Sequence, residues 1–181
     1  GVIATRSGDS RWITSERSRR HAHKMRAHMD AIVVGAGTVM ADDPRLDVRL
    51  VRGPNPKPFI VDGKLRTTPG ACVFSERQGV LLTGKSAPVE RLEEFRRAQI
   101  EVWAFDDIDG VIDLQAVVAR AGEQGIMSML VEGGRTLAAA ALRDRIVDEV
   151  VVYVAPLVIG EGVSAIGDLG VDRLAQAIHL D

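Results

Sequence analysis

Residues 79–131 read GVLLTGKSAPVERLEEFRRAQIEVWAFDDIDGVIDLQAVVARAGEQGIMSMLV, and their pattern indicates the fold class. Apolar runs of strand length alternate in this stretch with amphipathic segments of helix length. Elements that alternate at this spacing are typical of right-handed βαβ units, which build a parallel sheet. The strands are expected over residues 79–83, 100–105 and 126–131, and the helices over residues 88–98 and 113–122, with Asp113 as the cap of the second helix.

The alternation continues on both sides of this stretch. A first helix, capped by Thr14 or Ser15, is expected to end near Met29. The longest apolar run, residues 150–159, predicts a buried strand, and no helix of useful length follows Arg143. The other expected elements are strands over residues 31–34 and 59–62, a proline-rich loop over residues 53–58 and a helix over residues 136–143. The predicted fold is α/β: a single-domain, mainly parallel twisted sheet with helices on both faces and antiparallel C-terminal strands.

Length and composition narrow the classes of function. The chain has 181 residues, of which 46% are hydrophobic and 27% charged, as in an ordinary globular domain. The formal net charge of −2 argues against a nucleic-acid partner, although a local phosphate site remains open. No apolar run reaches the roughly 18 residues of a membrane helix, and no signal peptide is recognised. The single cysteine, Cys72, is interpreted as a small core residue. Because the sequence has no second cysteine for a disulfide within the chain, a reducing, cytoplasmic compartment is expected.

A parallel sheet binds its ligands beyond the carboxyl ends of its strands. The segments in that position are residues 35–43, 62–66, 84–86 and 132–136. The candidate binding site is therefore expected among these four segments.

The strongest of these motifs is VEGGRTL, residues 131–137. Gly133 and Gly134 stand between a predicted strand and a predicted helix, where glycine allows a positive φ and a close approach of a ligand to the backbone. The free N–H groups of the helix start suit a phosphate or pyrophosphate, and the Glu132 carboxylate at the strand end can meet a donor of a substrate. A tight turn without any ligand is the alternative.

The sequence GAGTVM, residues 35–40, fails the dinucleotide fingerprint of a Rossmann fold. The third glycine of that fingerprint should stand where Met40 stands, and no helix of normal length fits before Pro44. A glycine turn that carries Thr38 toward a ligand remains possible.

Arginines gather in the segment that follows. Arg45, Arg49 and Arg52 lie close in the sequence, and Arg26 lies on the predicted first helix. Guanidinium groups match phosphate oxygens in two-pronged geometry, so these residues predict a phosphate site, with a solvated basic face as the alternative. The adjacent acidic pair at residues 42–43 can be a simple turn before a proline.

The histidines and tryptophans have simpler interpretations. His21 and His23 point to different sides of the expected helix, and His21 and His28 lie about two turns apart, so no metal site is predicted. Trp12 is either a core residue that staples onto the first helix or a cover for a flat cofactor ring. Trp103 lies within a predicted strand and is expected in the core.

Taken together, these motifs resemble one family. In order along the chain stand SRWIT (10–14), Arg26, VGAGTVMADDPRLDVR (34–49), IVDGKLR (60–66), LVEGGRTLAAAAL (130–142) and VDEVVVYVAPLVIG (147–160). This series resembles the reductase domain of the bifunctional riboflavin-biosynthesis deaminase/reductase, which has a dihydrofolate-reductase-like fold. The resemblance covers nearly the whole chain, so residues 1–181 are expected to form one such domain.

The resemblance implies reduction of 5-amino-6-(5-phosphoribosylamino)uracil to the ribitylamino product by hydride transfer from NADPH to C1′. The implied substrate contacts are Ser10, Arg26, Leu46, Arg49 and Glu132, with Arg26 and Arg49 on the ribose phosphate. The implied cofactor contacts are Trp12, Thr38, Asp42, Gly63, Arg66, Gly134, Arg135, Thr136, Leu137, Ala138, Ala139 and Ala140. Glu132 is the tentative catalytic residue, either orienting or protonating the substrate, with water as the other proton source. No metal ligand is implied.

The sequence departs from the family pattern at two places. Gly63 stands where the family usually has a serine that helps to bind the cofactor, which weakens the inferred preference for NADPH over NADH. Arg66 is retained and can meet a 2′-phosphate. The family's first strand, which ends in SLDG, is also absent, with Gly1 matching its last residue, so this strand and the C-terminal end are expected to be missing from the sequence rather than from the protein.

The zinc motif of the deaminase, His-x-Glu followed by Pro-Cys-x-x-Cys, does not occur in the sequence. The chain is then either the reductase part of a protein with an N-terminal deaminase domain or a stand-alone reductase. A homodimer is expected, with residues 150–159 at its interface. The alternatives are a paralogous reductase of a pterin-like or other ribosylated heterocycle and a non-catalytic dimerising domain of the same fold.

Overall fold

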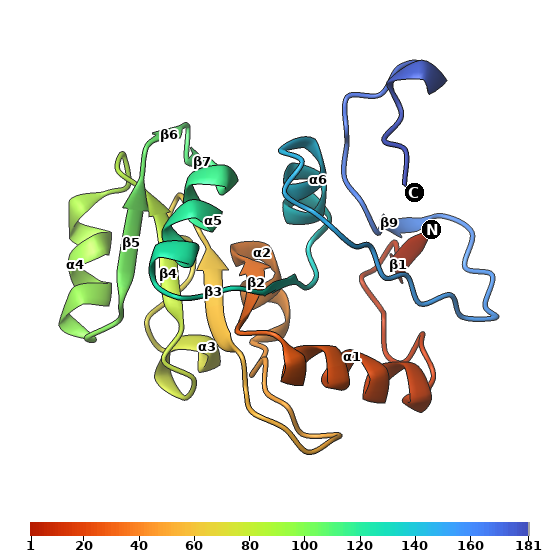
Figure 1. Cartoon of the computed structure of the whole chain (residues 1–181), viewed down its shortest axis with the longest axis horizontal. Coiled ribbons are helices and arrows are strands. Elements are labelled where there is room, and N and C mark those ends of the chain that lie inside the picture. Colours follow the sequence, from red (N-terminus) through yellow and green to blue (C-terminus); the bar gives the residue numbers. More distant parts are fainter. Residues whose placement is uncertain (181) are drawn as a thin grey trace.

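The computed structural model describes residues 1–180, and its centre is a five-stranded parallel sheet (Figure 1). The strand order is β5-β4-β3-β2-β8, and all four neighbouring pairs are parallel. The strands are β2 (Ala31–Gly35), β3 (Lys57–Val61), β4 (Val80–Gly84), β5 (Val102–Phe105) and β8 (Met129–Val131). This arrangement confirms the predicted α/β class.

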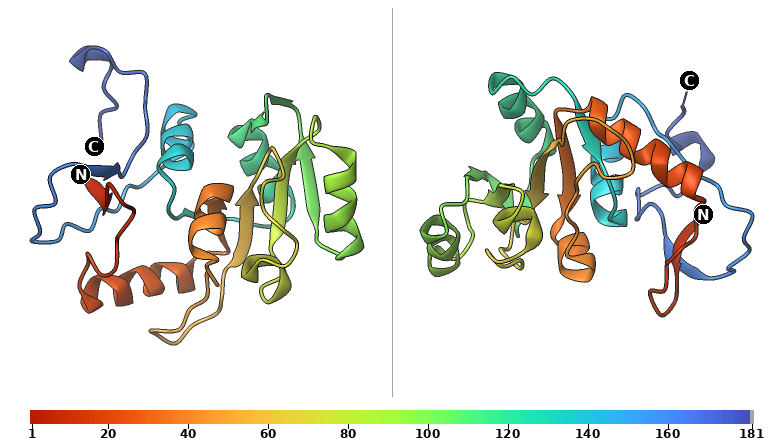
Figure 2. Two further views of the ribbon diagram at one scale, coloured as in Figure 1. Left: turned by 180° about the vertical axis from the view of Figure 1, so that it is seen from behind. Right: turned by 90° about the horizontal axis from the view of Figure 1, so that it is seen from below.

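Helices cover both faces of the sheet, as predicted (Figures 1 and 2). One face packs against α2 (Ala36–Asp42), α3 (Cys72–Ser75) and α4 (Val89–Arg97) through Val39, Phe74 and Phe95. The other packs against α5 (Leu114–Glu123) and α6 (Arg135–Arg143) through Val117, Leu137 and Ala141. Trp103 lies in this second core and is nearly fully buried, as expected.

The predicted helix caps are present. The first helix, α1 (Glu16–His28), begins after Ser15, whose hydroxyl accepts from the N–H of Ser18 at 3.1 Å. Asp113 caps α5 by accepting from the N–H of Gln115 at 2.8 Å. Each side chain satisfies one of the N–H groups that a helix start leaves free.

The proline-rich loop ends earlier than predicted, because Lys57 and Pro58 belong to β3. The N–H of Lys57 points toward β2 and donates to the carbonyl of Asp30. The nitrogen of Pro58 therefore points toward β4, where pairing begins only at Phe59. A residue without an N–H fits this place in the strand.

The predicted strand over residues 150–159 is wrong. The segment has no strand pairing, and Val154 and Val158 are 88% and 101% exposed. An apolar β-branched sequence becomes a strand only where a neighbour pairs with its backbone, and the outer edge of β8 has no partner strand among residues 1–180. C-terminal antiparallel pairing is limited to β9 (Gly162–Ser164), which pairs with β1 (Val2–Thr5) apart from the main sheet.

Three smaller elements complete the described chain. Strands β6 (Asp107–Ile108) and β7 (Val111–Ile112) form a hairpin, and Leu174–Gln176 form one turn of 3-10 helix. None of the helices in residues 1–180 is long and apolar enough to cross a membrane.

Candidate active site

The strand order brings three of the four predicted ligand segments together. The chain continues from β2 to β3 on one side, whereas β8 lies on the other side of β2. Such a reversal opens a crevice at the carboxyl ends of the strands, which is where open α/β sheets bind ligands. Residues 35–43, 62–66 and 132–136 follow β2, β3 and β8 at this edge. Residues 84–86 follow β4, one strand further away, beside the β6–β7 hairpin.

The two glycines after β8 form a cradle at the start of α6. Gly133 and Gly134 have φ values of +75° and +86°, which side chains rarely adopt. A Cβ on Gly134 would lie 3.1 Å from Oγ1 of Thr38, which stands in the first turn of α2. Gly134 provides no side-chain cap to α6, so the first N–H groups of that helix stay available. The cradle suits an anionic group such as a pyrophosphate.

Glu132 and Arg26 form a two-pronged ion pair beside this cradle. Nε and Nη2 of Arg26 donate to the two carboxylate oxygens of Glu132 at 2.8 and 2.7 Å. The N–H of Glu132 donates to the carbonyl of Val33 at 2.9 Å, which fixes the residue at the sheet edge. Both carboxylate oxygens accept from Arg26, so this geometry makes Glu132 an acceptor toward a substrate rather than a proton donor.

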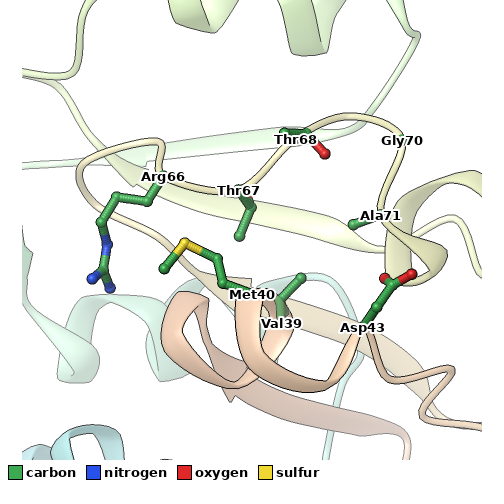
Figure 3. Close-up of a pocket in the computed structure, with 8 residues that line it drawn as sticks. All are labelled: Val39, Met40, Asp43, Arg66, Thr67, Thr68, Gly70 and Ala71. Carbon is green, nitrogen blue, oxygen red and sulfur yellow. The ribbon is translucent and has the colours of Figure 1, made fainter.

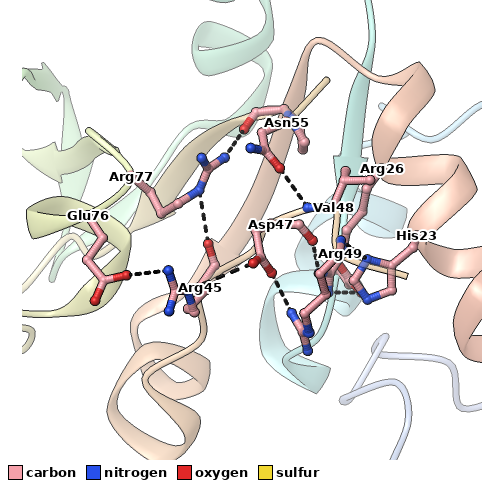
Figure 4. Close-up of polar contacts among 11 residues, drawn as sticks. His23, Arg26, Arg45, Asp47, Val48, Arg49, Asn55, Glu76 and Arg77 are labelled. Atoms are coloured by element: carbon pink, nitrogen blue, oxygen red, sulfur yellow. Dashed lines mark hydrogen bonds and ion pairs between the residues drawn. The ribbon is translucent and has the colours of Figure 1, made fainter. Parts of the chain in front are cut away.

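The remaining guanidinium nitrogen of Arg26 reaches residues 43–49, here called the arginine loop. Its Nη1 donates to the carbonyl of Asp47 at 2.9 Å, and the Asp47 carboxylate accepts from Arg49 (Figure 4). Burial acts to raise the pKa of Asp47, but the hydrogen bond and charge of Arg49 outweigh it and lower the pKa. Arg26 thus has protein partners at all three nitrogens, whereas Arg49 remains more than half exposed.

The other end of the arginine loop is tied to α3 and the loop before β3. Arg45 forms an ion pair with Glu76 at 2.9 Å, and its carbonyl accepts from Nε of Arg77 at 3.2 Å (Figure 4). The N–H of Val48 donates to Oδ1 of Asn55 at 2.7 Å. These contacts hold the loop that carries Arg49.

A hollow of about 400 Å³ lies on the α2 side of the crevice (Figure 3). Met40 and Val39 line it from α2, and Figure 3 shows Arg66 at one end and Asp43 at the other. The buried Asp62 carboxylate shapes the loop that carries Arg66, accepting from the N–H groups of Arg66 and Thr67 at 2.9 and 2.7 Å. The structure therefore supplies an exposed cation beside a space of small-molecule size.

Gly63 is required by the neighbouring hairpin. A Cβ at this position would lie 1.9 Å from the carbonyl oxygen of Gly110, in the turn between β6 and β7. A serine therefore cannot stand here without displacing that turn, which gives a physical reason for the departure from the family pattern.

Several predicted residues have surroundings that the sequence did not indicate. Trp12 is 69% exposed, so it is not the core staple that was one of the two expectations, and it contacts α1 through the Arg19 guanidinium, which stacks 4.4 Å from the centre of its ring. Ser10 and Asp42 are exposed. Leu46 is buried in the core that faces α2, so only its backbone can face a ligand.

Residues 134–140 also divide into two groups. Arg135 and Thr136 are exposed at the helix start, whereas Leu137 is buried against the sheet and Ala139 is buried beside Gly167. Only the first group can offer side chains to a ligand, and the second group can support the helix.

Cys72 is half-buried rather than part of the core. Its thiol donates to Oδ2 of Asp43 at 3.1 Å, and this hydrogen bond raises the pKa of the thiol. Asp43 also accepts from the N–H of Cys72, which joins α3 to the end of α2. Among residues 1–180, no group of three or more His, Cys, Asp and Glu side chains could hold a metal ion.

The sequence analysis did not single out Tyr153. Its hydroxyl lies 2.7 Å from Nδ1 of His21 and 3.4 Å from Sδ of Met25. Burial raises the pKa of Tyr153, and the charge of Glu132 raises it further. The one available signal was that the chain's single tyrosine stands within the apolar run 150–159.

The parallel sheet, its crevice and the glycine cradle define an α/β domain of the dihydrofolate-reductase-like class. The chain belongs to the RibD C-terminal domain family, whose model matches residues 1–180.

Two relatives illustrate the range of this family. The chain is 38% identical to a 2,5-diamino-6-ribosylamino-4(3H)-pyrimidinone 5′-phosphate reductase of Methanothermobacter thermautotrophicus, and the match covers 100% of this chain and 85% of that protein. It is 34% identical to the riboflavin biosynthesis protein RibD of Actinobacillus pleuropneumoniae, with 99% of this chain and 49% of that protein covered. The chain therefore spans about half the length of that RibD relative.

Solved structures of RibD proteins are also similar to this chain. RibD of Acinetobacter baumannii has a TM-score of 0.78 at 25% identity, over 99% of this chain and 49% of that one. A deaminase/5-amino-6-(5-phosphoribosylamino)uracil reductase of Thermotoga maritima has a TM-score of 0.69 at 28% identity, over 96% of this chain and 47% of that one.

Proposed function

We propose that this domain reduces 5-amino-6-(5-phosphoribosylamino)uracil to 5-amino-6-(5-phosphoribitylamino)uracil with NADPH, as a step of riboflavin biosynthesis. The observation that carries the proposal is the juxtaposition of the glycine cradle with the Glu132–Arg26 pair and the arginine loop. The cradle suits a cofactor pyrophosphate, and the polar groups beside it suit a phosphorylated substrate. The reductases named among its relatives support the same reading.

The residues of the crevice fit a dinucleotide. Gly133, Gly134 and the free N–H groups of α6 would hold the pyrophosphate, with Thr38 beside them. Arg66 would meet the 2′-phosphate that distinguishes NADPH from NADH. When bound, NADPH supplies the hydride. The proposed cofactor contacts are Trp12, Thr38, Asp42, Gly63, Arg66 and residues 134–140, of which the buried Leu137 and Ala139 would act only by supporting the helix.

The substrate would lie between Glu132 and the arginine loop. Arg49, the more exposed of the two proposed phosphate ligands, would make the main phosphate contact, whereas Arg26 would act chiefly by holding Glu132. Glu132 would accept from an N–H or O–H of the substrate and so fix its orientation. Ser10 and the backbone of Leu46 would complete the proposed substrate contacts.

The chemistry needs little from the protein beyond alignment. The ribosylamine ring opens to an imine, whose C1′ is electrophilic. Hydride adds to C1′ and the imine nitrogen gains a proton, so that the C=N bond becomes CH–NH. Because both oxygens of Glu132 accept from Arg26, we assign the proton to water and an orienting role to Glu132.

A second candidate substrate differs only in the pyrimidine ring. The Methanothermobacter relative, 85% of which is covered by this chain, is named for 2,5-diamino-6-ribosylamino-4(3H)-pyrimidinone 5′-phosphate. That compound has an amino group in place of one oxygen of the uracil. Both compounds carry the ribose phosphate, so the proposed contacts of Arg49 and Glu132 do not discriminate between them.

Steady-state assays with each substrate test the proposal. NADPH oxidation should depend on the phosphoribosylaminouracil and yield the ribitylamino product by mass, with the larger kcat/KM for that substrate. Arg49→Ala should raise KM about 10- to 100-fold, since one charge-assisted hydrogen bond is worth about 1.5–3 kcal/mol, whereas Arg97→Ala on α4 should not change KM. NADPH binding without turnover of either substrate would overturn the proposed reaction.

We also propose a homodimer, a fused N-terminal deaminase domain and a cytoplasmic location. The exposed apolar side chains of residues 150–158 support an interface with a second copy. The RibD relatives, about twice the length of this chain, support the fusion. The single, half-buried cysteine suits the reducing cytoplasm. Light scattering of the protein would report a monomeric mass if the dimer proposal were wrong.

A further inference from the structure

His23 is the one buried residue of α1, and it faces the arginine loop. Its Nδ1 accepts from the backbone N–H of Arg49 at 3.2 Å (Figure 4). A ring nitrogen accepts a hydrogen bond only when it carries no proton, so this contact requires the neutral imidazole with its proton on Nε2.

Two tethers therefore join α1 to the arginine loop. His23 holds the N–H of Arg49, and Arg26, one turn later on the same helix, holds the carbonyl of Asp47. The Asp47 carboxylate in turn accepts from the Arg49 side chain. The backbone of Arg49 is thus fixed by His23, and its guanidinium is fixed by Asp47.

Charged groups of three elements face the imidazole. Arg26 lies on α1, Asp47 and Arg49 on the arginine loop, and Glu132 at the end of β8. Burial lowers the pKa of His23, the two arginines lower it further, and the two carboxylates only partly oppose them. The neutral form is therefore favoured at neutral pH. A proton on Nδ1 would point at the N–H of Arg49 and break the tether.

We propose that neutral His23 is a positioning residue for the substrate phosphate, because it fixes the backbone of Arg49. This inference rests on the proposed function of Arg49. When His23 is protonated or replaced by a side chain without an acceptor, the loop loses one of its two tethers to α1. Affinity for the phosphorylated substrate then falls, whereas affinity for NADPH and the rate of hydride transfer change little.

Three variants of α1 test the proposal. His23→Asn places Oδ1 where Nδ1 stands and cannot be protonated in this pH range, whereas His23→Leu removes the acceptor at similar bulk. His28→Leu changes an exposed histidine of the same helix. At pH 8, KM for the substrate should rise about five- to tenfold in His23→Leu and stay near the wild-type value in the other two variants, with kcat little changed.

The pH profile separates positioning from a merely structural role. Between pH 8 and pH 5 the phosphate itself gains a proton with a pKa near 6, so KM rises in every variant. In the wild type and His28→Leu, KM should rise further as His23 is protonated. In His23→Asn, KM should not show this additional rise. Equal KM values for the Leu and Asn variants, or the same pH profile in the wild type and His23→Asn, would overturn the proposal.

A binding measurement with ribose 5-phosphate keeps this inference distinct from the proposed reaction. The dissociation constant of ribose 5-phosphate should be highest for His23→Leu and near the wild-type value for His23→Asn and His28→Leu. This order should hold whether or not the protein turns over either pyrimidine. If turnover is absent but ribose 5-phosphate binds about fivefold more weakly to His23→Leu than to His23→Asn, the reaction is wrong and the positioning role holds. If turnover is present and the two variants bind it equally, the positioning role is wrong.

Discussion

Strand β2 and residues 150–159 have similar sequences and opposite environments. AIVVG in β2 is paired on both sides, and Val34 is fully buried. VVVYVAPLVI at 150–159 is unpaired, and Val158 is fully exposed. Composition and β-propensity are alike, so the difference lies in the partners: β2 is enclosed by β3 and β8, whereas the C-terminal segment contacts α1 through Tyr153. An apolar run predicts burial only where the fold supplies a neighbour.

The largest expected effect tests this contrast by placing a charge in each region. Val34→Asp would bury an unpaired carboxylate and should lower the free energy of unfolding by at least about 3 kcal/mol. At protein concentrations low enough to keep the chain monomeric, Val158→Asp should change it by no more than about 0.5 kcal/mol, because the side chain is exposed in its own chain. Urea unfolding of the two variants measures both values. A comparable loss in the monomeric Val158→Asp variant would show that residues 150–159 are buried within their own chain and would break the comparison.

Catalysis should also depend more on the sheet edge than on the C-terminal segment. Glu132→Gln removes the charge that pairs with Arg26 and should lower kcat about 100-fold through misalignment of the substrate, with NADPH affinity nearly unchanged. Tyr153→Phe removes only the hydroxyl contacts with His21 and Met25 and should lower kcat/KM less than about fivefold. Steady-state kinetics and NADPH titration separate the two. Equal losses of turnover and of NADPH affinity in Glu132→Gln would show a structural role for this residue.

Two glycines, one at the sheet edge and one in the C-terminal segment, allow the same comparison for NADPH binding. Gly134 and Gly160 have similar φ values of +86° and +79°, but only Gly134 faces another group, Oγ1 of Thr38. Alanine at either position should cost about 1 kcal/mol of stability, since both backbones are left-handed. Only Gly134→Ala should weaken NADPH binding, by about tenfold, because its methyl group narrows the cradle. Equal NADPH affinities in the two variants would show that the glycine cradle does not bind the cofactor.

The smallest expected effect is on the stability of the folded chain at acidic pH, to which the Asp47–Arg49 pair of the arginine loop contributes. The pKa of Asp47 is lowered below its usual value of 3.8, so its contribution to stability is present above that value and is lost as the pH falls through the lowered pKa. Asp47→Asn should therefore reduce the loss of stability between pH 5 and pH 3. Urea unfolding at the two pH values gives this difference. An unchanged loss would show that the Asp47–Arg49 pair does not stabilise the folded state.

Local signals explain what the sequence predicted well. The caps Ser15 and Asp113 and the alternation over residues 79–131 act within a few residues of themselves, so the helices, the strands and their parallel order follow from them. The glycines of the cradle were recognisable because a left-handed backbone excludes most other residues.

Long-range pairing explains what the sequence did not predict. Arg26 and Glu132 are 106 residues apart, and nothing near either residue indicates that they pair. His23 was considered only as a metal ligand, because its contact with Arg49 exists only after the arginine loop packs on α1. The strand prediction for residues 150–159 is wrong for the same reason, since strand pairing depends on a neighbour that is distant in the sequence.

The central claim is that the crevice at the carboxyl ends of β2 and β8 binds NADPH, and thermal unfolding with each cofactor tests it most directly. NADPH at 100 times its dissociation constant should add about 2.7 kcal/mol and raise Tm by several degrees, with a smaller rise in Gly134→Ala at the same concentration. NADH should raise Tm less, because it lacks the 2′-phosphate that Arg66 would meet. No rise in Tm with either cofactor would contradict the claim.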